Sequence, residues 1–424
     1  SQQRSGHNEE ALASLKTALD EWRAVGVESD GDAAANFAIA SAWQADALSA
    51  LGRADDALRV ADAARELATR LLERSPTHML ALRGRALLAS TEARIRGETG
   101  QRALQLAAAD AAAGDWRLLS RVDPGNVITI SNLGAAHANA SFALYELGRP
   151  REAVAKVLEP RALLEAASGR SARWSQQLAD RLFWAAIWSA ELGQAATAEK
   201  LLAGSHQAWT RWLQSLPRDA YLARFGQQVL ALDRVEIAVM QGDFAQARQS
   251  AKGLREHLLG VEPGQTPEQR AIRSRDLSRL HAALGRMELE RGDYGAAEGQ
   301  ARWAAEASAE LPLTTREYRT MRASDRALWA LALARLGRTE EAAPKAAEAL
   351  AAMRELDAKA GDGQMHKPPL AAALVASAWV DASRAKPLLD EAQKTLDSMP
   401  AEARGLRTSR WVEGLIGEAR RMLI

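Results

Sequence analysis

A chain of 424 residues is long enough for two or three globular domains or for one extended array of repeats. Its 55 basic and 54 acidic residues give a net charge of +1, which excludes a global electrostatic attraction to nucleic acid or anionic lipid. The absence of cysteine excludes disulfides, thiolate metal sites and thiol nucleophiles. The compartment stays open, with the cytoplasm favoured over the periplasm.

The composition favours helices throughout the chain. Alanine, leucine, arginine and glutamate dominate, while aromatic residues make up 5% of the sequence. These dominant residues lose little conformational freedom in a helix. No window of about 18 uninterrupted apolar residues occurs, so the sequence predicts no membrane span. We therefore expect an all-α protein.

The spacing of apolar residues predicts a continuous series of helices, with proline- and glycine-rich segments between many of them. In chain order these helices cover residues 8–25, 32–51, 54–74, 77–96, 101–121, 126–147, 150–168, 171–192, 195–215, 218–241, 244–259, 267–291, 294–311, 316–336, 339–357, 368–380, 383–397 and 401–423. They make about eight or nine pairs, and the last helix is expected to cap the C-terminal end.

One turn motif separates many of these helices. In LGRTEEA, Gly337 stands where a helix end favours a left-handed residue, which glycine adopts without steric cost. Thr339 is expected to cap the next helix, and the adjacent Glu340 and Glu341 complement its dipole. Ala342, five residues after the glycine, is small enough for the two helices to approach closely. The motif predicts a helical hairpin.

The same offset between glycine and alanine recurs along the chain, at Gly6, Gly52, Gly148, Gly193, Gly242, Gly292 and Gly337. Weaker copies lie near Gly97 and near residue 381. Helix pairs repeated at a nearly constant spacing are typical of stacked arrays, in which each unit covers its neighbour's apolar face. We expect one continuous repeat domain over residues 1–424. Because the chain starts within a turn, it is expected to be a fragment of a larger protein.

The pattern resembles the tetratricopeptide repeat (TPR) superfamily. Small and packing residues stand at the family's positions around the turn glycine: Ala45 and Leu48, Ser141 and Leu144, Ala330 and Leu333 before it, and Ala64, Ala304 and Ala349 after it. The spacing here is longer than the family's period of about 34 residues. Residues 116–126 resemble elongated repeats found C-terminal to effector domains of bacterial signalling proteins. The resemblance implies a right-handed α-α superhelix, a TPR-like solenoid.

The resemblance also implies a function and a binding surface. It implies a non-catalytic scaffold or sensor that binds a protein or peptide on its concave face and regulates an upstream kinase, cyclase, TIR or DNA-binding domain. The family's inner-surface positions, together with a neighbouring tryptophan, fall on Asp46, Ser49, Phe142, Tyr145, Asp180, Phe183, Trp184, Glu236, Arg279 and Arg286. Their mixed apolar and charged character suits a helix or an extended peptide in a groove.

Motifs for catalysis are absent from the sequence. The seven histidines are scattered without metal-ligand spacing, and neither a P-loop nor a G-x-S-x-G motif occurs. Acidic pairs such as Asp55-Asp56 lie at expected helix starts, where they complement the helix dipole. The sequence therefore predicts neither an enzyme nor a bound cofactor or metal.

Two clusters leave alternatives open. The tryptophans at 184, 188 and 209 either fill the core between helices or form an aromatic pocket, which would make the chain a small-molecule sensor. The arginines between residues 270 and 291 could form a stripe that binds an acidic peptide or phosphate, but the acids interleaved with them favour a solvated, salt-bridged face. Nucleic-acid binding stays a minor alternative. A third alternative is a self-association domain that oligomerises the upstream effector.

Overall fold

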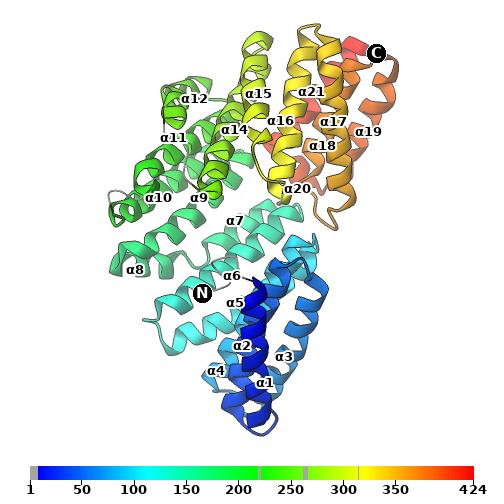
Figure 1. The fold of residues 1–424 in the computed structure, drawn as a ribbon. Helices are drawn as coiled ribbons and strands as arrows, with labels where there is room; N and C mark the ends of the chain where they lie inside the picture. The colour runs from blue at the N-terminus through cyan, green and yellow to red at the C-terminus, as the bar shows by residue number, and fades with distance from the viewer. Residues whose placement is uncertain (1–7, 218–220, 261–265, 314) are drawn as a thin grey trace. The chain divides into compact units, whose positions relative to one another are not determined.

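The computed structural model describes residues 8–217, 221–260, 266–313 and 315–424 (Figure 1). Every regular element in these ranges is a helix. The expected turn at Gly6 and the proline expected between helices at residue 263 lie outside the described residues. Every helix in the described ranges is too short or too polar to span a lipid bilayer.

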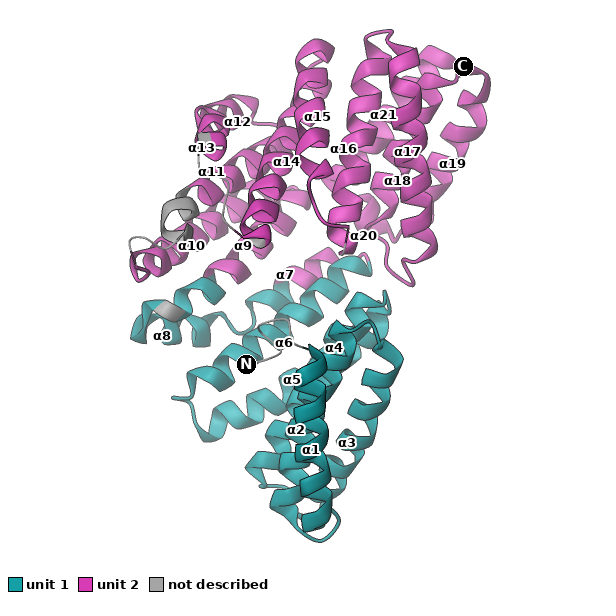
Figure 2. Cartoon of the chain, viewed as in Figure 1, with its two compact units in different colours: residues 1–147, 155–178 teal, residues 148–154, 179–424 magenta. Residues whose placement is uncertain are grey.

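The chain forms two compact units, which are coloured separately in Figure 2. The first unit comprises residues 1–147 and 155–178. Its helices are α1 (Asn8–Val25), α2 (Gly31–Ala50), α3 (Ala54–Arg74), α4 (Met79–Glu98), α5 (Arg102–Val122), α6 (Val127–Glu146), α8 (Arg161–Arg170) and the 3-10 helix Ala172–Trp174. Helix α7 (Pro150–Leu158) has residues in both units.

The second unit comprises residues 148–154 and 179–424. It holds most of α9 (Ser175–Glu191) and all of α10 (Ala195–Gln214), α11 (Tyr221–Gln241), α12 (Phe244–Ala251), α13 (Leu254–Gly260), α14 (Pro267–Glu290), α15 (Tyr294–Ala309), α16 (Arg316–Arg335), α17 (Thr339–Ala358), α18 (Lys367–Val380), the 3-10 helix Ala382–Arg384, α19 (Ala385–Asp397), α20 (Ala401–Arg404) and α21 (Arg407–Leu423). The single domain expected from the sequence stays a prediction.

The turn glycines occupy the corners between helices, as predicted. Gly52, Gly148, Gly193, Gly242, Gly292 and Gly337 have φ of 76 or 77°. At the end of α16, the Arg338 N–H donates to the Leu333 carbonyl at 3.0 Å. The Gly337 N–H donates to the Ala334 carbonyl, also at 3.0 Å, which completes the two bonds of a Schellman motif. This motif satisfies carbonyls that the helix end would leave without a donor.

The alanine five residues after each of these glycines lets the two helices of a hairpin approach closely. All six, Ala57, Ala153, Ala198, Ala247, Ala297 and Ala342, are fully buried. Helices also pack beyond their own hairpin, since α2 contacts α3 and α4, and α16 contacts α17 and α18. The prediction of an all-α fold, in which helix pairs pack on neighbouring pairs, is confirmed within each unit.

The turn predicted at Gly97 lies three residues later. Gly97 is within α4, and Gly100, with φ of 79°, forms the corner. The residue five positions after Gly100 is Gln105, whose buried side chain replaces the usual alanine. A Cβ on Gly97 would lie 2.9 Å from that side chain. Gly97 therefore leaves space for the larger Gln105 side chain at the helix crossing. Because no alanine follows Gly100 at the usual offset, the motif does not mark this corner in the sequence.

Three expected helices are broken in the structure, and one expected cap residue differs. The helices expected over 150–168, 244–259 and 401–423 are each broken in two, near Pro160, Gly253 and Gly405. The apolar spacing continues across each break, so periodicity alone could not reveal it. Thr339 is the first residue of α17 instead of its cap, and Arg338 holds the cap position without a capping side-chain bond.

Candidate functional site

Five of the sequence-predicted binding residues line one cleft in the second unit. Its volume is about 470 Å³. Asp180, Phe183 and Trp184 come from α9, Glu236 from α11 and Arg279 from α14. These three helices each precede a turn glycine. We call this cavity the aromatic cleft; Ala179, Ile187, Ser205, Trp209, Val229, Leu230, Asp233, Met240, Arg275 and Glu317 complete its lining.

Aromatic rings form one wall of the aromatic cleft. Phe183 meets Trp184 edge to face, with ring centroids 5.3 Å apart. Trp209 of α10 also lines the cleft, and its ring lies 4.8 Å from that of Trp212. Trp188, 6.0 Å from Trp184, is fully buried and belongs to the core. Trp188 therefore packs in the core, whereas Trp184 and Trp209 line the cleft.

A charged network centred on Arg279 also lines the aromatic cleft. The guanidinium donates to both carboxylate oxygens of Glu236, at 2.8 and 2.5 Å. It also donates to Asp233 at 3.3 Å, and Asp276 lies 3.8 Å away. Since a fork-like pair fixes orientation as well as charge, Arg279 is held rigidly between α11 and α14. Its guanidinium carbon is 5.9 Å from the Phe183 ring, so the network reaches the aromatic wall.

Burial changes the protonation of these groups. Burial acts to lower the pKa of Arg279, but the charges of Glu236, Asp233 and Asp276 outweigh it and raise the pKa. Burial raises the pKa of Asp233 to about 7, although Arg279 opposes this shift. Burial also raises the pKa of Asp180 to about 6, partly offset by the charge of Arg181. The two aspartates thus titrate near neutral pH.

His206 lies beside this network. Its Nε2 lies 4.0 Å from an Asp233 oxygen. Burial lowers the pKa of His206 to about 4, and the charge of Arg234 acts in the same direction. In the described part of the chain, no group of three or more His, Cys, Asp or Glu side chains is arranged to hold a metal ion.

Four other predicted residues lie in the first unit and form no part of the aromatic cleft. Asp46 pairs with Arg94 of α4 at 2.7 Å, and Ser49 donates to Glu98 of α4 at 3.0 Å. These are contacts between the first helices of neighbouring repeats. Phe142 and Tyr145 are half-buried on α6.

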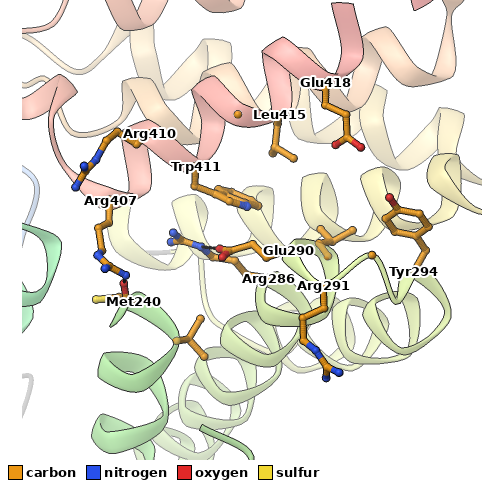
Figure 3. A pocket seen from close by; sticks show the side chains of 14 residues that line it. Met240, Arg286, Glu290, Arg291, Tyr294, Arg407, Arg410, Trp411, Leu415 and Glu418 are labelled. Atoms are coloured by element: carbon orange, nitrogen blue, oxygen red, sulfur yellow. Dashed lines mark hydrogen bonds and ion pairs between the residues drawn. The ribbon is translucent and has the colours of Figure 1, made fainter. Parts of the chain in front are cut away.

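Arg286, the tenth predicted residue, lines a different cavity of about 740 Å³ against α21. Its guanidinium lies 4.8 Å from the Trp411 ring and donates to Glu290 at 3.0 Å. Figure 3 shows Trp411 above Arg286 and Glu290, with Arg407 and Arg410 on one side and Tyr294 and Glu418 on the other. The chain's own C-terminal helix therefore engages Arg286.

Helix α21 does more than the expected capping of the last hairpin. It packs on α18 and α19, as a cap should. In addition, the Thr408 N–H donates to a carboxylate oxygen of Glu191 at 3.0 Å, and the Thr408 hydroxyl donates to the other oxygen. Arg407 donates to the Met240 carbonyl. Sequence reasoning missed these contacts, because nothing local in α21 specifies that it reaches the ends of α9 and α11.

Part of the arginine-rich segment at residues 270–291 lines a third cavity, of about 370 Å³. Arg270 and Arg273 line it together with Arg255, His281 and Trp303. The Arg255 guanidinium carbon lies 4.1 Å from the Trp303 ring. Further along the run, Arg275 pairs with Asp276 at 2.9 Å. The arginines between residues 270 and 291 thus contact different partners and form no single stripe.

A comparison with protein-family models finds no match. No curated protein matches the chain. Among solved structures, the chain is similar to yeast Tom70, with a TM-score of 0.26 and 12% identity over 97% of this chain and 96% of that one. It is also similar to the TPR domain of P58(IPK), with a TM-score of 0.23 and 13% identity over 100% and 98%.

A circular tandem repeat protein with a novel repeat topology matches at a TM-score of 0.24 and 16% identity, over 98% of this chain and 97% of that one. At scores this low, the assignment of the fold depends on the glycine corners and helix pairing of this chain itself. Those features make it a TPR-like helical-repeat protein in fold.

Proposed function

We propose that the chain is a non-catalytic binding domain that holds a segment of another protein, or a peptide, in the aromatic cleft. One observation carries the proposal: the first helices of three consecutive repeats bring aromatic, apolar and charged side chains to a single cavity. Aromatic anchors beside fixed charged groups are typical of the centres of protein interfaces. Among the described residues no group of His, Cys, Asp or Glu side chains is arranged to hold a metal ion, and the Ser205 hydroxyl in the lining donates to the Ala179 carbonyl.

In this proposal the chain is the scaffold or sensor part of a bacterial multidomain signalling protein. The resemblance of residues 116–126 to repeats that follow effector domains supports this context. Binding would regulate or position the effector through a small change in the packing between neighbouring repeats, because each repeat contacts mainly its neighbours.

The test is a selection of displayed peptides against the full chain, followed by affinity measurements with purified variants. We expect Trp184→Ala to weaken binding about tenfold or more, as loss of an aromatic anchor does. The double variant Phe142→Ala plus Tyr145→Ala, on α6 of the first unit, should bind like wild type. Loss of binding in the double variant, with wild-type affinity in Trp184→Ala, would place the site in the first unit and refute the proposal.

The volume of the aromatic cleft favours one second candidate, a small-molecule sensor. About 470 Å³ lies within the range of about 300–1,000 Å³ that small-molecule sites occupy. In that case a metabolite panel should contain compounds that raise the melting temperature of the wild type. The same compounds should leave Trp184→Ala unchanged, and compounds that stabilise both proteins equally would argue against the cleft.

A further inference from the structure

The acidic and basic groups that line the aromatic cleft differ in number. Its described lining carries the four carboxyl groups of Asp180, Asp233, Glu236 and Glu317, but only two guanidinium groups. Both guanidinium groups are already paired, since Arg279 is held by Glu236, and Arg275 by Asp276 outside the lining. The lining therefore has more acidic than basic groups.

Two of these carboxyl groups are available to a ligand. Among the described residues, no hydrogen bond or ion pair reaches the carboxyl group of Asp180, which lies beside Phe183 and Trp184 on α9; the charge of the adjacent Arg181 acts on it without forming a pair. Glu317, at the start of α16, is exposed and likewise has no such partner in the described part of the chain. An acceptor that is half-buried in a cavity is best satisfied by a donor that enters with the ligand.

The rest of the lining suits the same kind of ligand. The faces of Trp and Phe rings attract cations, and this attraction grows when water is displaced from the site. Ile187, Val229, Leu230 and Met240 add an apolar surface that an aliphatic chain could cover. A cationic head on an alkyl stem matches the carboxylates, the rings and this surface together.

We propose that the aromatic cleft binds a cationic alkyl group, of the kind that a lysine or arginine side chain presents, as the anchor of its ligand. This inference rests on the proposed function and specifies the chemistry of the partner. The same chemistry also occurs in a free alkylamine, so the experiment has one arm for each source.

The experiment titrates the full chain with capped tripeptides of the form glycine-X-glycine and follows tryptophan fluorescence and calorimetry. X is lysine, arginine, norleucine or glutamate; norleucine keeps the alkyl stem of lysine without the charge. Butylammonium is the free-amine arm. We expect the lysine or arginine peptide to bind about tenfold more tightly than the norleucine peptide. If butylammonium binds and the peptides do not, the ligand is still a cationic alkyl group, but it is a free small molecule instead of a side chain.

Asp180→Asn should reduce the preference for lysine over norleucine several-fold, because it removes the charge with little change in shape. Glu317→Gln, at an exposed position that cannot disturb the core, should reduce it by a smaller factor. Asp55→Asn, an exposed aspartate on α3, is the matched control and should leave the preference unchanged.

Equal binding of the lysine and norleucine peptides, or tighter binding of the glutamate peptide, would overturn the inference while the cleft remained a binding site. Binding of none of these probes would also overturn it. The proposed function would fail only if the peptide selection, too, gave no ligand that depends on Trp184.

Discussion

The glycine corners make a prediction that separates backbone conformation from packing. Gly337 and Gly148 have the same left-handed backbone, with φ of 76 and 77°. A Cβ on Gly337 would meet nothing within 4 Å, whereas on Gly148 it would lie 2.9 Å from Pro400 and 3.1 Å from Ala403. Gly337→Ala should therefore lower the free energy of unfolding by about 1–2 kcal/mol, which is the cost of a left-handed backbone at a residue with a Cβ. Gly148→Ala should lose more stability, so it should have the lower melting temperature of the two variants.

Gly299→Ala is the control for this pair. Gly299 lies within α15, without a positive φ and with no atom within 4 Å of a new Cβ. Alanine is favoured over glycine in a helix by about 1 kcal/mol, so this variant should be as stable as the wild type or more stable. Equal losses in Gly337→Ala and Gly299→Ala would contradict the left-handed corner.

A buried carboxyl group makes stability depend on pH. Burial raises the pKa of Asp325 to about 7, although its hydrogen bonds with Ser278 and Ser308 act to lower it. Unfolding returns this carboxyl to its ordinary pKa of 3.8. Between these values the folded state binds more protons than the unfolded state, so the free energy of unfolding falls as pH rises from about 4 to about 7. Asp325→Asn should remove this loss.

The measurement compares the melting temperatures of Asp325→Asn and wild type at pH 4.5 and at pH 8. The asparagine oxygen can still accept the Ser278 hydroxyl, which lies 2.7 Å from the present carboxyl oxygen. The variant should gain stability relative to wild type at pH 8, and this gain should shrink at pH 4.5. A difference that stays the same at the two pH values would refute the assignment. Glu21→Gln, at an exposed position inside α1, provides the baseline.

At this scale the sequence predicts the repeated positions but misses the individual partnerships. Gly337 and Ala342 were predictable, because a left-handed corner and a close helix crossing each restrict the residue type strongly. The network of Arg279 was not, since Glu236 lies 43 positions away on another helix and is one of many acids that an arginine could meet. Only the stacking of α14 against α11 selects it.

At the scale of elements, apolar periodicity located the helices but not the breaks within them. Pro160 separates α7 from α8, whereas α17 continues through Pro344. A rule based on proline alone could not distinguish these two cases. Likewise, the amphipathic pattern of α21 predicted a cap, but the buried Glu191 that binds its first turn belongs to α9.

The contact between Glu191 and the N-terminus of α21 leads to a prediction at the scale of elements. A carboxylate that accepts from a first-turn N–H stabilises a helix through a hydrogen bond and the helix dipole. Glu191→Ala should destabilise the second unit by about 1–2 kcal/mol. Hydrogen exchange should accelerate first in α21, which would lose the two bonds that Thr408 makes.

Glu199→Ala is the matched control, because Glu199 is exposed on the next helix, α10. It should leave both the melting temperature and the exchange of α21 unchanged. If hydrogen exchange of α21 is already rapid in the wild type and does not change in Glu191→Ala, the contact contributes little to the stability of this helix.

At the scale of the molecule, each unit has a core cluster of its own. Trp116 and Leu133 belong to a cluster confined to the first unit, and Leu374 and Ile416 to one confined to the second. The sequence could not reveal this division. The turn at Gly148, where the second unit's first segment begins, has the same motif as the other corners.

This separation predicts a local effect of removing residues 400–424. The deletion takes away Val412, Ile416 and Ala419, which are buried against α18 and α19 in the core of the second unit. Because each repeat is stabilised mainly by its neighbours, hydrogen-exchange protection should fall in α18 and α19. Helices α2 to α5 of the first unit should keep theirs. Met422→Ser, at a position 66% exposed, should change neither region. Equal loss of protection in α2 to α5 and in α18 and α19 would mean that the chain unfolds as one cooperative body, with a free energy shared by every repeat.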